Sequence, residues 1–456
     1  MAKRISLRIS GGDWSKLRNL LFTADGHENS AVLLCGKSQE EGGDKLLVRE
    51  IVSVASDQYI DRQPYHLEIA PGFYNSVVDR CLRDRLIPVI CHSHPFDGPA
   101  SYSSSDDFGE KRLLPVLESL LPGQKPASLL LTRTSVGGRI LDHSRFSTLQ
   151  DVTITGPRVQ VLLLTASRKK REREQALFDR QIRAFGMEGQ RTLESLTTAI
   201  VGLGGIGSLV AEQLVRAGIR KLILVDFDAV ESSNLNRLFG ATPASVGLPK
   251  VQVVADHLES IRQVGVESIC DSVLKQSVLK RLRVADLVIS CVDSDLARST
   301  LTRFAYQYLT PLVDMGVRLD AREGRVTAAA GRVSVVGVDG ACLRCSHHIN
   351  PERVRAESLS PAEREALGRE GYVMGIDEPA PAVVTLNCAL AGLGATAAIN
   401  LFLNLTGNFQ PTSQLYDATA GIVFTATPVH EFGCDICDEQ QGVKALGDLQ
   451  VVSAYD

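Results

Sequence analysis

The sequence is poor in aromatic side chains and has little net charge. Aromatic residues make up 5% of its 456 residues, with one tryptophan, and the formal net charge is −4 at pH 7. A chain without an excess of basic residues gives no reason to expect a nucleic-acid partner. Its first residues, MAKRISLRISGGDW, lack the continuous apolar core of a signal peptide. We therefore expect a cytoplasmic protein with neither a nucleic-acid nor a membrane partner.

Cysteine is also scarce, with 10 residues in the whole chain, which is too few for a disulfide scaffold of this size. Four of these cysteines form two Cys-x-x-Cys pairs, Cys342 with Cys345 and Cys434 with Cys437. Four thiolates satisfy the tetrahedral coordination of zinc completely. The pairs therefore predict a structural zinc site that ties the end of the chain to its middle, and a chance occurrence of two such pairs is the alternative.

One apolar run, residues 382–405, carries no charge and is long enough to cross a membrane. Thr385, Asn387, Thr396 and Asn400 interrupt it, and no aromatic belt flanks it. We interpret the run as a buried helix packed against a sheet.

The stretch 197–237 is the most informative part of the chain. Apolar residues 199–201 enter a loop, an amphipathic helical pattern follows, and a second apolar strand, 221–225, ends in Asp226. The loop contains Gly202, Gly204, Gly205 and Gly207. Such glycines let the backbone approach phosphate, the helix N-terminus supplies N–H groups, and the acid holds ribose hydroxyls. The pattern predicts a Rossmann-like α/β domain with a mostly parallel sheet.

Residues beyond Asp226 favour a triphosphate over a nicotinamide coenzyme. Asn234 and Arg237 follow closely, and Lys250 comes thirteen residues after Arg237. Two cations and an amide beside a ribose-binding acid suit ATP better than NAD, so an NAD oxidoreductase is the more distant interpretation. Asp293 ends a further apolar strand, where an acid can hold magnesium near the phosphates.

On these residues, the region from about 175 to 440 resembles the adenylating domain of the ThiF/MoeB and ubiquitin-activating enzyme family. The resemblance implies ATP and magnesium as cofactors, with Asp226 on the ribose and Asp293 on magnesium. It assigns Asn234, Arg237 and Lys250 to the phosphates, and the same family carries the four-cysteine zinc site. It also implies a homodimer in which Arg180 reaches the triphosphate of the other subunit, whereas pairing of Arg180 within its own helix is the alternative.

A second candidate site follows an apolar strand at 87–91 and a helical pattern over 71–84. His92 and His94 end that strand and point the same way. An aspartate that opens the next helix would complete a zinc site with three protein ligands and a water. Such zinc provides a hydroxide nucleophile and polarises a carbonyl. Two registers fit, Ser103 with Asp106, which we favour, and Ser104 with Asp107.

This second set resembles the JAB/MPN (JAMM) metalloprotease family. The resemblance implies zinc ligands at His92, His94 and Asp106, an oxyanion-stabilising serine at Ser103 and a general acid/base at Glu28. Glu50 is a rival for the last role. The spacing between His94 and Ser103 is one residue longer than is usual in that family.

Together, these features predict a JAB/MPN isopeptidase-like domain over 1–165, a charged linker over 166–176, an adenylating domain over 177–440 and a C-terminal tail over 441–456. Both sites would act on a ubiquitin-like protein, as in bacterial counterparts of ubiquitin conjugation. The first would cleave after the diglycine tail, and the second would adenylate the exposed glycine carboxylate. Two alternatives stay open: activation of a sulfur-carrier protein for thiamin, molybdopterin or cysteine synthesis, and a first domain that only docks the substrate.

No obvious thiol is available to form a thioester with the activated protein. The stretch 346–387 contains no cysteine. Cys388 lies in the apolar run, where we expect a buried and inert thiol, and Cys291 ends a strand and is expected in the core. The adenylate would then pass directly to a thiol of a partner, such as a conjugating enzyme.

Overall fold

The computed structural model divides the chain into two compact units, which are described separately. Unit 1 comprises Met1–Lys170 and Lys444–Gln450, and unit 2 comprises Arg171–Val443 and Val451–Asp456. The structure describes residues 4–40, 43–142, 145–164, 176–337, 339–360, 362–364, 381–405, 407, 412–438 and 441–452. The predicted linker, except for residue 176, lies outside the described residues.

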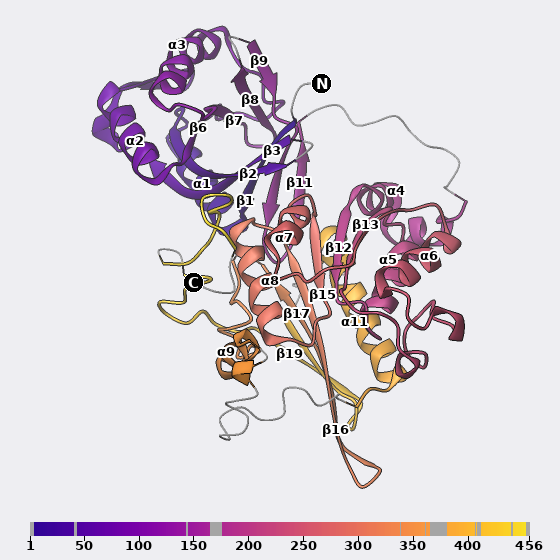
Figure 1. The fold of residues 1–456 in the computed structure, drawn as a ribbon. Helices are drawn as coiled ribbons and strands as arrows, with labels where there is room; N and C mark the ends of the chain where they lie inside the picture. The colour runs from indigo at the N-terminus through magenta and orange to yellow at the C-terminus, as the bar shows by residue number, and fades with distance from the viewer. Residues whose placement is uncertain are drawn as a thin grey trace. The chain divides into compact units, whose positions relative to one another are not determined.

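A nine-stranded mixed sheet forms the centre of unit 1 (Figure 1). Its strand order is β11-β10-β1-β3-β2-β6-β7-β8-β9, and a separate hairpin pairs β4 with β5. The strands are β1 (Arg4–Ser10), β2 (Ser30–Glu40), β3 (Gly43–Ser53), β4 (Tyr59–Gln63), β5 (His66–Ile69), β6 (Ile87–Ser93), β7 (Ala127–Leu131), β8 (Val136–Asp142), β9 (Arg145–Thr148), β10 (Asp151–Thr155) and β11 (Gln160–Leu163).

Helices pack on both faces of this sheet because its central strands are apolar on both faces. Leu33 of β2 belongs to a core cluster with Leu17 of α1 (Gly11–Leu21). The next residue, Leu34, belongs to a cluster with Val77 of α2 (Pro71–Asp84) and Leu114 of α3 (Ser104–Leu120). The helix predicted over 71–84 is confirmed as α2, and the strand predicted over 87–91 is the first part of β6.

Residues 444–450 belong to unit 1, where they lie along β2. The backbone N–H of Asp448 donates to Lys37 O at 2.7 Å, and Gln39 N donates to Asp448 Oδ2 at 2.7 Å. Lys444 Nζ lies 2.6 Å from Asp13 Oδ2 of α1. The structure therefore differs from the predicted tail over 441–456, because backbone and side-chain groups of unit 1 bind part of this segment.

Unit 2 is built on an eight-stranded sheet in the order β14-β13-β12-β15-β16-β17-β18-β19. Its first five strands run parallel, and β16 to β19 are paired antiparallel. The prediction of a mostly parallel sheet is therefore wrong for the second half, where β16 with β17 and β18 with β19 form hairpins whose short connections permit only antiparallel pairing. The strands are β12 (Thr197–Val201), β13 (Lys221–Val225), β14 (Gly265–Ile269), β15 (Leu287–Ser290), β16 (Leu312–Arg322), β17 (Arg325–Val336), β18 (Ser413–Asp417) and β19 (Ile422–Ala426).

Helices cover both faces of the parallel half, with α5 and α6 on one face and α7 and α8 on the other (Figure 1). The strand order reverses between β12 and β15, so the carboxyl ends of these two strands form the topological switch point where α/β sheets bind ligands. The helices are α4 (Asp179–Ser195), α5 (Gly207–Ala217), α6 (Lys250–Ile261), α7 (Gln276–Leu282), α8 (Asp295–Gln307), α9 (Pro351–Ser358) and α11 (Val384–Leu403).

The long apolar run forms α11, which by length and composition could also cross a membrane. In unit 2 it packs against α5, α4, β16 and β17, and 56% of its most apolar window is buried. This is the placement expected of a helix that covers a sheet in a globular unit.

Candidate nucleotide and metal sites

Backbone geometry requires glycine at two positions of the loop between β12 and α5. Gly202 has a φ of +86°, and a Cβ there would lie 2.7 Å from Cys291 O. A Cβ on Gly207 would lie 1.9 Å from Gly202 O, so the loop closes tightly on itself. This close turn places the N-terminus of α5 beside the loop, where its N–H groups can bind phosphate.

A pocket at this loop brings together most of the residues predicted to bind the nucleotide. It is lined by Gly204, Gly205, Asn234, Arg237, Leu238 and Lys250. The glycines come from the end of β12, the amide and the guanidinium come from the segment after β13, and the lysine opens α6. The two cations therefore face the same pocket as the glycine loop, as predicted.

Asp226 links the glycine loop to the end of β13. Its carboxylate accepts hydrogen bonds from Leu203 N at 2.6 Å and Asp228 N at 2.9 Å. Burial raises the pKa of Asp226, although these two donors and Lys250 act in the opposite direction. Lys250 Nζ forms an ion pair with Asp228 Oδ2 at 2.6 Å, so a second acid holds the lysine at the pocket.

Arg237 and Asn234 are held by local hydrogen bonds. Arg237 Nη1 donates to Ser233 O at 2.5 Å and to Asn236 Oδ1 at 3.2 Å. Asn234 is 8% exposed, and its Oδ1 accepts from Glu231 N at 3.2 Å. The segment after Asp226 is therefore a folded turn that presents the guanidinium to the pocket.

The other predicted residues of the nucleotide site do not line this pocket: Gly202, Gly207, Asp226, Asp293 and Arg180. Asp293 is exposed between β15 and α8, and its carboxylate makes no hydrogen bond or ion pair with another described residue. A free carboxylate at the carboxyl end of a strand next to β12 fits a magnesium ligand. Arg180 is exposed in the first turn of α4.

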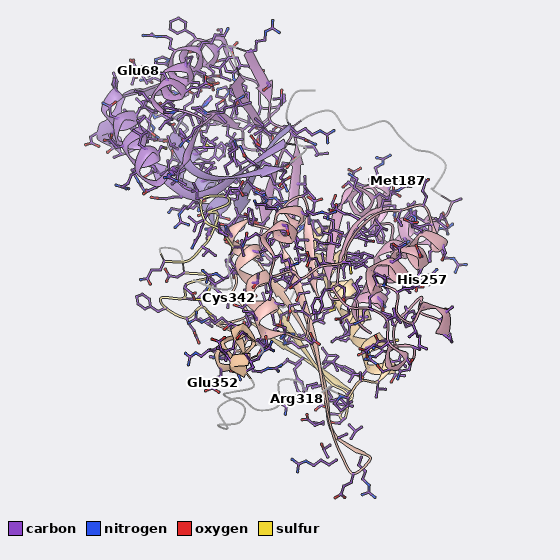
Figure 2. All side chains as sticks on the ribbon, viewed as in Figure 1. Glu68, Met187, His257, Arg318, Cys342 and Glu352 are labelled. Carbon is purple, nitrogen blue, oxygen red and sulfur yellow. The ribbon has the colours of Figure 1, made fainter. Side chains whose placement is uncertain are left out.

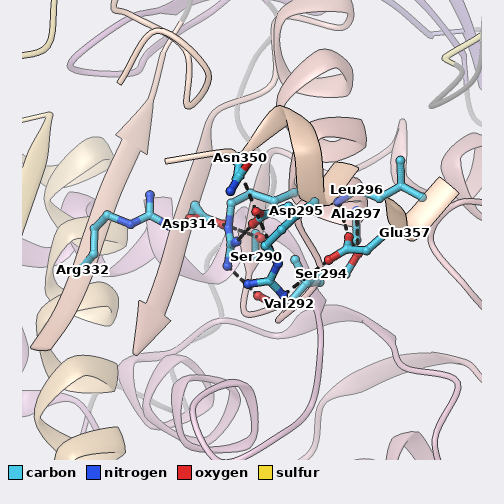
Figure 3. Close-up of polar contacts among 12 residues, drawn as sticks. Ser290, Val292, Ser294, Asp295, Leu296, Ala297, Asp314, Arg332, Asn350 and Glu357 are labelled. Atoms are coloured by element: carbon cyan, nitrogen blue, oxygen red, sulfur yellow. Dashed lines mark hydrogen bonds and ion pairs between the residues drawn. The ribbon is translucent and has the colours of Figure 1, made fainter. Parts of the chain in front are cut away.

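A buried network of charged residues, which the sequence did not reveal, contacts the backbone of Val292, one residue before Asp293 (Figure 3). Arg298 donates to Val292 O at 2.7 Å, to Asp295 Oδ1 at 2.7 Å and to Asp314 Oδ1 at 3.1 Å. Arg332 Nη2 donates to the other oxygen of Asp314 at 2.7 Å. These residues come from β15–α8, β16 and β17, and only the tertiary fold brings them together.

Unit 1 gathers the second predicted site at the carboxyl end of β6. Asp106 Oδ1 lies 3.2 Å from His92 Nε2, and Asp106 Oδ2 lies 3.3 Å from His94 Nε2. Candidate ligand atoms of all three residues lie within 4.8 Å of one another. His92 Nε2 is buried, and the Asp106 carboxylate is the polar group that lies beside it. Two imidazole nitrogens that converge on one carboxylate in this way fit a zinc site with three protein ligands.

The structure distinguishes the two registers of serine and acid. Asp107 forms an ion pair with Arg139 of β8 at 2.5 Å and does not belong to the metal cluster. Ser103 caps α3, since its Oγ accepts from Asp106 N at 3.1 Å and its own N–H donates to Asp106 Oδ2 at 2.6 Å. The favoured register, Ser103 with Asp106, is the one that reaches the histidines.

Glu28 and its rival Glu50 have different surroundings. Glu28 is 5% exposed, and its Oε1 lies 3.7 Å from His94 Nε2. Burial raises the pKa of Glu28. Arg62 Nε donates to the backbone carbonyl of Glu28 at 3.2 Å and holds this segment in place. Glu50 instead pairs with Arg80 of α2.

The four cysteines of unit 2 form one buried cluster; Cys342 is labelled in Figure 2. The Sγ atom of Cys342 lies 3.7 Å from the Sγ atoms of Cys345 and Cys434, and Cys345 Sγ lies 3.5 Å from Cys437 Sγ. Four sulfurs at about 2.3 Å from one zinc ion would lie about 3.8 Å apart. These separations fit a tetrahedral zinc site and are too long for disulfide bonds.

The expectation of a buried thiol at Cys388 is wrong, because Cys388 is exposed. It lies on α11, whose apolar residues surround the helix, so the sequence pattern could not identify the buried face. Cys291 is partly buried after β15. Within the stretch 346–387, residues 361 and 365–380 lie outside the described residues.

Comparisons with known proteins agree with the fold of unit 2. The ThiF family model matches residues 178–435. The chain is 34% identical over 219 residues to ubiquitin-like modifier-activating enzyme 5 of Drosophila virilis, covering 45% of this chain and 50% of that protein. It is 34% identical over 160 residues to molybdopterin-synthase adenylyltransferase of Escherichia coli (strain K12), covering 34% of this chain and 63% of that protein.

The chain thus spans about half the length of the ubiquitin-like modifier-activating enzymes it matches. Among solved structures, it is similar to the Microcin C7 biosynthetic enzyme MccB in complex with N-formylated MccA, with a TM-score of 0.48 and 18% identity, covering 57% of this chain and 75% of that one. The family match covers more than half of the sequence and includes the glycine loop and the residues of the pocket. It also includes Cys342, Cys345 and Cys434. The chain belongs to the ThiF family.

Proposed function

We propose that unit 2 adenylates the C-terminal carboxylate of a ubiquitin-like protein that ends in two glycines. The observation that supports this best is the pocket in which the glycine loop faces both Arg237 and Lys250. In the proposed reaction, a carboxylate oxygen attacks the α-phosphorus of ATP, the bond to the β-phosphate oxygen breaks, and pyrophosphate leaves. The enzyme contributes positioning and charge neutralisation to this displacement.

The predicted residues in the pocket and around it have separate roles in this proposal. Asp226 holds the ribose, and the glycine loop with the N-terminus of α5 holds phosphate oxygens. Asn234, Arg237 and Lys250 neutralise the phosphates. Asp293 would hold magnesium, which supplies charge neutralisation when bound. The protein would act as a homodimer in the cytoplasm, with Arg180 reaching the triphosphate bound to the other subunit.

We also propose that unit 1, as a JAB/MPN-type domain, cleaves after the diglycine tail of the same protein. His92, His94 and Asp106 would hold zinc, and bound zinc would supply a nucleophilic water and polarise the scissile carbonyl. Glu28 would take a proton from that water and return it to the leaving amine. Ser103 would donate a hydrogen bond to the oxyanion. The convergence of His92, His94 and Asp106, whose candidate ligand atoms lie within 4.8 Å of one another, supports this proposal.

The acceptor of the activated carboxylate is proposed to be a thiol of a partner, such as a conjugating enzyme. The stretch 346–387 has no cysteine, and Cys388 is an exposed thiol on α11. Gel analysis of Cys388→Ser would separate the two routes. An adduct that survives non-reducing gels in the native protein and is absent in the variant would assign the acceptor to this chain.

Exchange of labelled pyrophosphate into ATP, in the presence of candidate diglycine-ended proteins, tests the adenylation proposal. We expect Lys250→Ala to reduce exchange by about 100-fold, as is typical when one group that stabilises transition-state charge is lost. Ser103→Ala in unit 1 is the matched control and should exchange as the native protein does. Absence of exchange in the native protein with every candidate, together with binding of a nicotinamide coenzyme, would contradict the proposal.

Cleavage of a ubiquitin-like protein extended beyond its diglycine tail tests the role of unit 1. Glu28→Ala should abolish cleavage and keep pyrophosphate exchange. A first unit that only docks the substrate would lose nothing in this variant. Reconstitution with a sulfur donor would identify the alternative in which the activated protein is a sulfur carrier.

A further inference from the structure

Asn387, on the first turns of α11, lies against the glycine loop of unit 2. A Cβ on Gly205 would lie 2.3 Å from Asn387 Nδ2 and 3.3 Å from Cγ and Cδ of Arg237. The amide and the arginine thus contact the same point of the loop. Gly205 and Arg237 both line the nucleotide pocket, so a helix far along the chain reaches the edge of this pocket.

The residue Asn387 is largely buried, and its side-chain amide has no hydrogen-bond partner among the described residues. The residue is 4% exposed, and its backbone N–H donates to Val383 O at 3.2 Å. Its side chain makes no hydrogen bond to any residue that the structure describes. The amide offers two N–H donors and a carbonyl acceptor. Because no described residue uses these groups, they are available to a ligand in the pocket.

The surroundings of the amide indicate the chemistry of that ligand. The glycine loop, the N-terminus of α5, Arg237 and Lys250 all present positive charge or N–H groups to the pocket. Nδ2 is the atom of Asn387 that faces Gly205. An N–H donor that lies among other N–H donors and cations is suited to bind an anionic or carbonyl oxygen.

We propose that Asn387 donates a hydrogen bond to an oxygen of the reacting groups at the glycine loop, and so positions them for adenylation. This inference rests on the function proposed for unit 2. The oxygen belongs to a phosphate of ATP or to the acyl group that becomes attached to AMP, and the experiment below distinguishes these sources. The role also explains why glycine is needed at position 205, since any side chain there would displace the amide.

The test measures equilibrium binding of two probes to the full chain by calorimetry. One probe is ATP with magnesium, and the other is glycylglycyl sulfamoyladenosine, an acyl-adenylate analogue without β- and γ-phosphates. Loss of one hydrogen bond to a charged oxygen should raise the Kd about 10- to 100-fold in Asn387→Ala. Asn387→Asp should raise it further, because a carboxylate would repel the bound anion at nearly unchanged size.

Weaker binding of both probes would assign the oxygen to the phosphate bound by the loop, and weaker binding of the analogue alone would assign it to the acyl group. Thr396→Ala is the matched control on α11, because the Thr396 hydroxyl donates to Gly392 O within the helix at 2.8 Å. A purely structural role would lower the melting temperature and leave both Kd values unchanged. Unchanged binding of both probes by Asn387→Asp would overturn the inference.

The two proposals fail in different ways. If the native protein binds ATP but exchanges no pyrophosphate with any diglycine-ended protein, the proposed substrate is wrong and the ATP measurement still tests Asn387. If both variants bind both probes normally while exchange proceeds, the role of Asn387 is wrong and adenylation stands.

Discussion

Single residues of the glycine loop differ in what the backbone tolerates. A Cβ on Gly207 would lie 1.9 Å from a carbonyl oxygen of the same loop, whereas a Cβ on Gly204 would have no atom within 4 Å. Gly207→Ala should therefore destabilise unit 2 by about 1–3 kcal/mol through overpacking. Gly204→Ala should change stability by less than about 0.5 kcal/mol. Thermal unfolding of both variants checks the pair, and equal melting temperatures would contradict the loop geometry.

The adjacent residues Asp106 and Asp107 at the start of α3 have different partners. Asp106 contacts both histidines, whereas Asp107 pairs with Arg139. The native protein should bind about two zinc ions per chain, one in each cluster, and Asp106→Ala should lose about one of them. Asp107→Ala should keep both, and should cost at most about 1 kcal/mol because the ion pair is partly exposed. Elemental analysis of dialysed protein measures the zinc, and zinc loss in Asp107→Ala alone would reverse the assignment.

At the scale of elements, α8 and its neighbouring strands depend on one buried carboxylate. Asp314 is fully buried on β16 and accepts hydrogen bonds from Arg298, Arg332 and Ser290. Burial alone would raise the pKa of Asp314, but the two guanidinium groups outweigh it and the pKa is lowered. Asp314 therefore fixes the packing of α8 and β17 on β16 through charge.

Asp314→Asn should destabilise unit 2 by about 3–5 kcal/mol, because it leaves Arg332 without its counter-charge and Arg298 with Asp295 alone. The pH dependence follows from the lowered pKa of Asp314. Its contribution is fully present above the unfolded pKa of about 3.9 and is lost as the pH falls through the lower folded pKa. Urea unfolding between pH 7 and pH 3 should show a smaller acid loss in the variant.

Ser290→Ala is the control for this measurement, since it removes one hydrogen bond from an uncharged donor to the same carboxylate. It should cost about 1.5–3 kcal/mol and should keep most of the acid dependence of the native protein, because Arg298 and Arg332 contribute more to the lowered pKa of Asp314 than Ser290 does. Equal stability of Asp314→Asn and the native protein at pH 7 would show that the network contributes little.

At the scale of the whole molecule, unit 1 is assembled from two segments that are far apart in the sequence. Ala445 is fully buried, and Arg49 Nη1 donates to Lys444 O at 2.6 Å. Ending the chain after Val443 should lower the melting temperature of unit 1 and speed hydrogen exchange along β2, because these contacts are lost. Zinc binding by the four cysteines should persist, since all four precede the truncation.

A point variant tests the same contact without truncation. A Cβ on Gly36 would lie 2.1 Å from Ala445 O, so Gly36→Ala should displace the segment 444–450 and reproduce the faster exchange. Gly72→Ala is the matched control in unit 1, because a Cβ there meets no atom within 4 Å. Normal exchange along β2 in Gly36→Ala would contradict the proposed contribution of this segment.

The sequence by itself determined the residues whose positions depend on short stretches of chain. Alternation along a strand places His92 and His94 on one side. The close spacing of glycines, acid and cations around β12 and β13 anticipated most of the pocket. The family match covers the adenylating part of this prediction, while the catalytic roles in both units stay predictions.

Only the tertiary structure decided features that depend on contacts between distant segments. Arg139 of β8 forms an ion pair with Asp107, whereas Asp106 contacts the histidines. Cys388 is exposed because an all-apolar helix carries no pattern that tells which face will pack. Asn387 lies beside Gly205 because α11 packs against α5. Contacts of this kind depend on how elements pack together, and no local pattern in the sequence records them.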